Sequence, residues 1–203
     1  MRKLMVVAVA ALAISSFGAA SAVAATYHAE SEGTTFTGSQ KSKYKMATIV
    51  GTLTCSIGTY SGEMKGTSSE MLTVQPAYTG CTLLGLPMTV SAVSCKYTFT
   101  PPTRTEGIRW HWRVHDSCSG KSTIAEDSVA FGCVIEVPSQ EGLEVMEGES
   151  IGPKSEIEAT WLVTGVSYSY TSGCPNVTMS GTRSDGTRGG SIRFTGSSPI
   201  WIE

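Results

Sequence analysis

Residues 108–115 (IRWHWRVH) constrain the fold more than any other stretch of this sequence. Apolar or aromatic residues occupy the even positions, and Arg109, His111, Arg113 and His115 occupy the odd ones. Successive side chains of a strand point to opposite faces, so this alternation predicts a half-buried β-strand. One face would bury two tryptophans, and the other would present the four basic side chains to water as a candidate binding face.

The same alternation recurs in residues 156–170, where Gly165 is expected to reset the register. The apolar side chains that would share one face of this strand are Ile157, Ala159, Trp161 and Val163. Asp185-Gly186 is the strongest hairpin-turn dipeptide of the chain and predicts a turn between strands at 176–183 and 188–195. Because neither an amphipathic helix nor a βαβ pattern is visible, the sequence predicts an all-β fold, an antiparallel β-sandwich with disulfides.

The first 25 residues have the pattern of a secretory signal peptide. Arg2 and Lys3 precede an apolar stretch at 4–14, and small residues around Ala24 and Ala25 suit cleavage. The apolar stretch is too short to span a bilayer, and no later segment approaches the length of a membrane-spanning helix. We therefore expect a signal peptide at 1–25, one domain at 26–203, and a secreted, extracellular protein.

The charge balance argues against nucleic acid as a partner. Removing Arg2 and Lys3 with the signal peptide lowers the count of Lys and Arg from 15 to 13, against 17 Asp and Glu, a net charge near −4. A chain with this balance has no general attraction to nucleic acid or to anionic membranes.

Six cysteines in an exported chain predict three disulfides, for which 15 connectivities are open. We expect the sequential pairing, in which Cys95 and Cys118 bracket a hairpin around Pro101-Pro102; a bridge between 118 and 133 fits almost as well. The sequential pairing joins Cys55 to Cys81, Cys95 to Cys118, and Cys133 to Cys174. The sequence contains no C-x-x-C motif, so it indicates neither a redox site nor a zinc site.

Three segments carry a loose family resemblance: residues 51–55 (GTLTC), 78–81 (YTGC) and 133–142 (CVIEVPSQEG). Together with the signal peptide, they resemble a group of uncharacterised secreted proteins of actinobacteria that has no assigned activity. The resemblance implies location outside the cytoplasm and a β-rich fold, and it implies no chemistry.

Two short motifs resemble catalytic signatures without their structural context. Residues 148–152 (GESIG) match the G-x-S-x-G elbow of α/β-hydrolases, but no histidine follows His115. His111 and His115 have the spacing of zincin ligands, which bind zinc on a helix. On a strand they would lie about 13 Å apart, too far to share a metal. We expect no metal and no cofactor.

Carboxylates provide the remaining candidates for chemistry. Glu156 and Glu158 would share a strand face about 6.6 Å apart, within the roughly 5–9.5 Å that separates glycosidase carboxylates. The glutamates at 141, 144, 147 and 149 could bind Ca²⁺, although the usual loop pattern is missing. For both groups a solvated strand or loop surface is the simpler interpretation.

Aromatic and basic side chains offer two candidate binding surfaces. The aromatic residues that could stack on sugars, but that the alternation places in the core, are Trp110, Trp112, Trp161, Tyr168 and Tyr170. The arginines that could face an acidic wall polymer, but that we expect to be dispersed in solvent, are Arg109, Arg113, Arg183, Arg188 and Arg193. The sequence thus favours a non-catalytic binding or cell-envelope module, whose partner is a cell-wall or extracellular polysaccharide or another secreted protein. The alternative is a secreted polysaccharide hydrolase that uses carboxylates.

Overall fold

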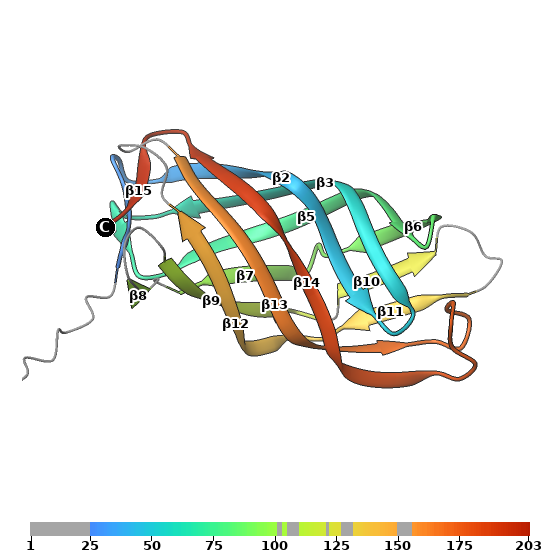
Figure 1. Ribbon diagram of the computed structural model, residues 1–203. Coiled ribbons are helices and arrows are strands. Elements are labelled where there is room, and N and C mark those ends of the chain that lie inside the picture. Colours follow the sequence, from blue (N-terminus) through green and yellow to red (C-terminus); the bar gives the residue numbers. More distant parts are fainter. Residues whose placement is uncertain (1–24, 101–102, 105–109, 121, 127–131, 150–155) are drawn as a thin grey trace, which may run out of the picture.

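The computed structural model describes residues 25–203 except 101–102, 105–109, 121, 127–131 and 150–155. All of the predicted signal peptide except its last residue lies outside the described part. Every regular element in the described ranges is a β-strand, and every strand pairing is antiparallel (Figure 1). The predicted all-β antiparallel class is therefore confirmed.

The strands fall into one large sheet and one small sheet. The small sheet contains β1 (Tyr27–Ala29), β4 (Ser68–Ser69) and β15 (Ile200–Ile202). The large sheet contains β2 (Thr34–Thr48), β3 (Gly51–Met64), β5 (Leu72–Leu83), β6 (Leu86–Ser91), β7 (Cys95–Phe99), β8 (Thr103–Arg104), β9 (Trp110–Cys118), β10 (Ser122–Glu126), β11 (Val134–Val137), β12 (Gln140–Glu149), β13 (Glu156–Tyr170) and β14 (Gly181–Gly196).

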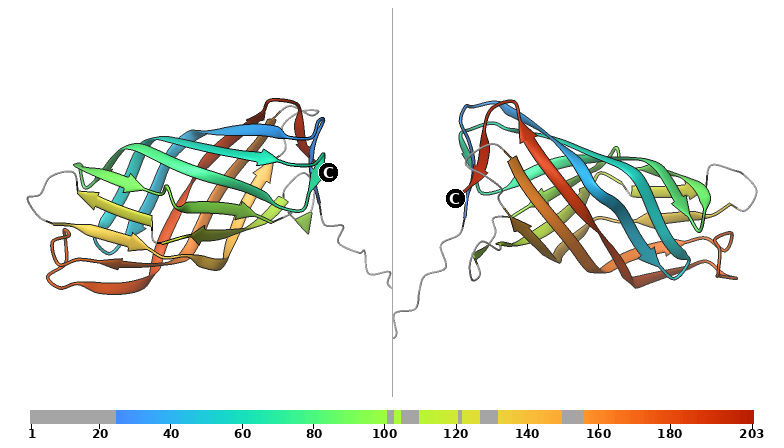
Figure 2. Two further views of the ribbon diagram at one scale, coloured as in Figure 1. Left: turned by 180° about the vertical axis from the view of Figure 1, so that it is seen from behind. Right: turned by 45° about the horizontal axis from the view of Figure 1, so that its top comes forward.

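The large sheet curls round and closes on itself, as the three views in Figures 1 and 2 show. Its strand order is β11-β10-β6-β5-β3-β2-β14-β13-β12-β9-β7, with β8 paired to β9. The last strand, β7, also pairs with β5, and the first, β11, also pairs with β13. The two packed walls expected of a sandwich thus belong to one continuous sheet, which we call the cylinder.

Strict alternation of side chains separates the inside of the cylinder from its outside. In β5 every second residue from Leu72 to Tyr78 is buried, and the residues between them are exposed. In β13 the predicted core face of Ile157, Ala159, Trp161 and Val163 is buried. Gly165 has a φ of 75° and lies at a register shift, as the sequence predicted. Because Gly accepts positive φ without a steric penalty, it realigns the strand so that Val166 and Tyr168 again face inward.

The small sheet covers one end of the cylinder, where the described chain begins and ends (Figure 1). Tyr27 and Ile200 are buried there, and the Tyr27 hydroxyl donates to the carbonyl of Thr100 at 3.4 Å. Backbone bonds in both directions between Thr26 and Glu203 hold the two chain ends together. The interior is therefore sealed at this end by side chains of the same core.

Three disulfides follow the sequential pairing. Cys55–Cys81 and Cys95–Cys118 each join residues directly opposite each other on paired strands, β3 with β5 and β7 with β9. Cys133–Cys174 joins the residue just before β11 to the connection between β13 and β14. Two disulfides therefore cross-link paired strands of the cylinder, and the third fixes the connection between β13 and β14.

The hairpin turn predicted at Asp185-Gly186 is wrong. β14 runs without interruption through both residues, and the chain reverses in residues 171–180 instead. Gly186 pairs with Val166, and a Cβ on it would lie 3.1 Å from the ring of Tyr168. This glycine therefore makes room for a packed aromatic ring and does not form a turn.

Residues 140–149, whose glutamates are expected on a solvated strand or loop surface, form the ten-residue strand β12. This strand fills the wall between β9 and β13, so its backbone groups find partners on both sides.

Candidate functional site

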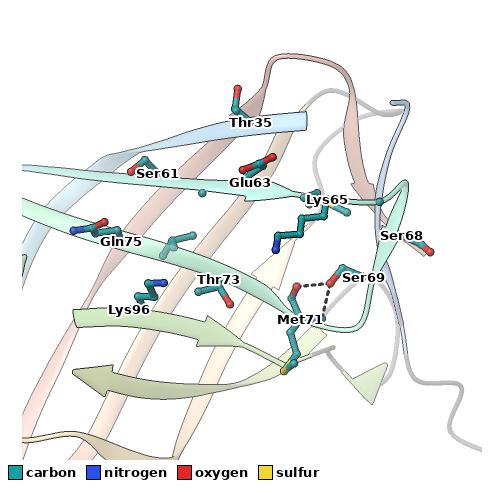
Figure 3. A pocket seen from close by; sticks show the side chains of 14 residues that line it. Thr35, Ser61, Glu63, Lys65, Ser68, Ser69, Met71, Thr73, Gln75 and Lys96 are labelled. Atoms are coloured by element: carbon teal, nitrogen blue, oxygen red, sulfur yellow. Dashed lines mark hydrogen bonds between the residues drawn. The ribbon is translucent and has the colours of Figure 1, made fainter. Parts of the chain in front are cut away.

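An outer groove of about 740 Å³ lies on the outside of the cylinder over β3, β5 and β7 (Figure 3). The polar and charged side chains that line this outer groove and enter the argument are Ser61, Glu63, Lys65, Ser69, Thr73, Gln75 and Lys96. A second depression, of about 580 Å³, shares Ser61 and Gln75 with it and extends the polar surface toward Val93. The two depressions form one elongated surface across adjacent strands.

The outer groove forms where β3 and β5 stop pairing. Their ladder ends at Ser61 opposite Gln75, and β5 then pairs with β7 through residues 72–74. A Cβ on Gly62 would lie 2.3 Å from Cζ of Phe36 and 2.4 Å from the carbonyl oxygen of Thr73. Only glycine fits between the ring beneath it and the neighbouring backbone, so Gly62 sets the depth of the groove floor.

Charged side chains approach the outer groove from opposite sides. Lys65, just after β3, and Lys96, on β7, are both exposed, and Thr73 lies between them (Figure 3). Glu63 is the one acidic residue among the described residues that line the groove. An exposed site with two ammonium groups and one carboxylate attracts anions, with strength that depends on salt.

Hydrogen bonds fix the neutral side chains around the outer groove. The Ser69 hydroxyl donates to the carbonyl of Met71 at 2.6 Å and accepts from its amide at 3.2 Å. Gln75 donates through Nε2 to the carbonyl of Val93 at 2.8 Å. The Thr73 and Thr98 hydroxyls lie 3.1 Å apart across β5 and β7. These bonds hold polar groups in place on rigid strands, which reduces the entropy lost on binding.

The predicted basic face of β9 lies next to the outer groove. The register places Thr73, Thr98 and His115 in one row across β5, β7 and β9. Arg113 is exposed and His115 half-buried, while Val114 between them is buried, so the predicted alternation of faces holds in this part of the strand.

Two other residues of that face are less fully described. Arg109 lies outside the described residues, and His111 is described only by its place on β9. The register sets Glu144 opposite Arg113 and Glu147 opposite His111, so acidic residues of β12 flank this basic face.

The two carboxylates considered for hydrolysis are held in ion pairs on the outer surface. Glu158 pairs with Lys41 and lies 3.7 Å from Arg193. Glu156 lies 3.3 Å from the same arginine. Both carboxylates thus already have cationic partners on β2 and β14, an arrangement typical of a solvated strand surface.

Aromatic side chains fill the inside of the cylinder and do not form an outer stacking platform in the described residues. Trp161 and Tyr168 are buried, and Tyr170 is half-buried. The side chains of Trp110 and Trp112 lie outside the described part. The expectation that these rings serve the core is met wherever their side chains are described.

The interior also holds a charged pair. Arg188 on β14 donates to the Asp116 carboxylate on β9, and each residue is 4% exposed. The guanidinium carbon lies 5.0 Å from the ring centre of Tyr97 and 5.7 Å from that of Trp161. The expectation that Arg188 is dispersed in solvent is therefore wrong.

The alternation of residues along β9 and β14 could have predicted this buried ion pair. Asp116 lies two residues after the buried Val114 on β9, and Arg188 precedes Ile192 and Phe194 on the inward face of β14. A charged residue at an inward position is costly to bury alone, so two such residues of opposite charge indicate a buried pair.

Burial governs the titration of the interior. It raises the pKa of the Asp116 carboxyl, while Arg188 offsets part of that rise. Burial lowers the pKa of Arg188, but the facing Asp116 carboxylate and the surrounding tyrosines raise it by more, so the guanidinium stays charged. Burial likewise raises the pKa of Tyr44, Tyr60 and Tyr78, and brings that of Tyr97 to about 12.

Within the described ranges, no three His, Cys, Asp or Glu side chains are grouped so as to hold a metal ion. The same ranges contain no helix with the length and apolar character needed to cross a membrane. No protein-family model, curated protein or solved structure matches this chain.

Proposed function

We propose that this protein is a secreted, non-catalytic module that binds an acidic polysaccharide of the cell wall or extracellular matrix through the outer groove. The observation that carries the proposal is the elongated polar surface over β3, β5 and β7, with Lys65 and Lys96 on either side of Thr73. The ion pairs of Glu156 and Glu158 favour this function over hydrolysis.

The chemistry of the outer groove suits a hydroxylated, anionic polymer. Hydroxyl and amide side chains both donate and accept hydrogen bonds, as sugar hydroxyls do. The two lysines supply cations for carboxylate or phosphate groups along the chain. Each exposed ionic contact contributes roughly 0.2–1 kcal/mol, so useful affinity requires repeated contacts along a polymer.

Three disulfides support the location. Such bonds persist in oxidising compartments and are rare in the cytoplasm, so their presence is compatible with an extracellular protein. The signal-peptide pattern at 1–25 supplies the route of export in this proposal.

Co-sedimentation of the oxidised, signal-free protein with insoluble cell-wall polysaccharide tests the proposal. We expect wild-type binding at low salt, and a roughly three- to tenfold lower apparent affinity for Lys65→Ser/Lys96→Ser. Lys43→Ser, which removes an exposed lysine of β2 outside the outer groove, serves as the matched control and leaves binding unchanged.

Unchanged binding by the double variant would exclude the outer groove as the binding site. Loss of binding only in Arg113→Ser would move the site to the basic face of β9. If no acidic polysaccharide binds the wild-type protein, the proposal fails and a secreted protein becomes the better partner.

A further inference from the structure

The ion pair inside the cylinder leaves three buried polar atoms unsatisfied. Asp116 Oδ1, Arg188 Nε and Trp161 Nε1 have no hydrogen-bond partner among the described residues. Each of the three residues is 4% exposed, so bulk water has little access to them. The three residues lie together, because Arg188 bonds to Asp116 through the other carboxylate oxygen and lies over the ring of Trp161.

Leaving such atoms without partners is costly. A buried donor or acceptor without a partner costs about 1–3 kcal/mol, and a charged group costs more. More than nine-tenths of buried polar groups in proteins have a partner, counting ordered water. Three exceptions on neighbouring residues of one core point to a bound molecule that supplies the missing bonds.

The three atoms specify the hydrogen-bonding pattern of that molecule. Arg188 Nε and Trp161 Nε1 are donors, so the molecule must accept from both. Asp116 Oδ1 is an acceptor, so the molecule must also donate. A buried water molecule typically makes about three hydrogen bonds, and two accepted bonds with one donated bond match this site.

The surroundings limit the size and charge of the molecule. The ring centres of Tyr44 and Tyr78 are 4.4 Å apart, and those of Tyr44 and Trp161 are 5.8 Å apart, so packed rings occupy the space around the pair. The pair is neutral as a whole, and a further ion would have to lose its hydration without a counter-charge. A small uncharged molecule is thus favoured over an ion or a larger ligand.

We infer that Asp116, Arg188 and Trp161 form a buried site for one water molecule inside the cylinder. The water bridges the free carboxylate oxygen to the guanidinium and the indole, and completes a polar link between β9, β14 and β13. The buried side chains around this link are packed together, which fits a filled interior with ligands bound outside. The site is independent of the outer groove and stands or falls separately from the proposed function.

A crystal structure of the signal-free protein at 1.5 Å or better tests the inference directly. We expect one spherical density peak within about 2.7–3.2 Å of Asp116 Oδ1, Arg188 Nε and Trp161 Nε1. If no such peak is present and the three atoms instead form hydrogen bonds with protein groups, the water site is overturned. Elongated density of several bonded atoms would also overturn it and would identify an organic ligand.

Trp161→Phe tests the role of the indole, because it keeps an aromatic ring and removes the donor. We expect the density peak to weaken or disappear and Tm to fall by about 2–4 °C. The matched control is Trp201→Phe at the chain end. There Nε1 donates to the Glu203 carboxylate at 3.4 Å near the surface, so this substitution should leave Tm unchanged. An unchanged peak and Tm in Trp161→Phe would exclude the indole from the site and contradict the inference.

Discussion

Arg188 and Asp116 show how single residues can determine the character of a core. Tyr44, Tyr97 and Trp161 surround them, so the charges are shielded from water by aromatic rings. Burying two charges has a large desolvation cost, which the mutual attraction and the added hydrogen bonds must offset. We therefore expect the pair to contribute little to net stability compared with apolar residues of the same size.

Removing one partner of this pair should be far more harmful than removing both. We expect Arg188→Met to lower the free energy of unfolding by about 3–5 kcal/mol, because it leaves a buried carboxylate without a cation. Arg188→Met/Asp116→Leu should recover most of that loss. Urea denaturation at pH 7 measures both values.

Arg183→Met is the control for the loss of an arginine on the same strand. Arg183 is 46% exposed on its side chain and lies 4.0 Å from Asp185. A change within about 0.5 kcal/mol is expected, as for most exposed positions. If Arg188→Met were equally mild, the pair would not be buried as described.

At the level of elements, the alternation of residues along a strand predicts which face is buried, but it does not predict which strands pair with each other. The inward faces of β9 and β13 and the register change at Gly165 follow from neighbouring residues, so the sequence could show them. The closure of the sheet depends on pairings of β5 with β7 and of β11 with β13. Such pairings join distant segments and have no local pattern in the sequence.

The outer groove was beyond prediction for a related reason. Its shape arises where the β3–β5 ladder ends and β5 changes partner, which a local pattern does not reveal. The basic residues of β9 were predictable, because their alternation is local. Arg188 was misassigned because its charge was weighed without its inward position on the strand.

The Cys133–Cys174 disulfide is an element-scale constraint with a measurable effect. It closes a segment with a sequence separation of 41, so Cys133→Ser/Cys174→Ser should lower the free energy of unfolding by about 3–4 kcal/mol. The strands should stay paired, since Thr171 also bonds to Val134 and Gly132. Denaturation with far-ultraviolet circular dichroism measures both effects.

A loss below about 1 kcal/mol would mean that these hydrogen bonds alone fix the loop. The matched comparison is Cys55→Ser/Cys81→Ser, which removes a bridge between directly paired strands with a sequence separation of 26. Its expected cost is similar, about 3 kcal/mol.

On the scale of the whole molecule, the closed sheet and its small end sheet enclose most of the tyrosines. Burial raises the pKa values of six of the seven: Tyr168 and, by a larger amount, Tyr27, Tyr44, Tyr60, Tyr78 and Tyr97. The folded state thus keeps protons that the unfolded state loses above its ordinary pKa of about 10. This stability is fully present below pH 10 and is lost as the pH rises toward the folded values.

Alkaline titration followed at 295 nm should therefore be cooperative. The five tyrosines with the larger shifts should remain protonated to about pH 11 and ionise together as the protein unfolds, with Tyr97 at about 12 setting the lower limit among them. The same titration in 6 M guanidinium chloride is the control, with all seven ionising near pH 10. A smooth native titration of all seven at pH 10 would show that water reaches the interior.

The central claim is that a rigid, filled cylinder binds an acidic polysaccharide on its outer surface. Nuclear magnetic resonance of the labelled protein, titrated with soluble fragments of the polysaccharide that it retains, tests this most directly. We predict chemical-shift changes at the amides of Lys65, Thr73, Gln75 and Lys96, and none at the indole of Trp161. Changes centred on that indole, or confined to the outer face of β13 and β14, would contradict the account.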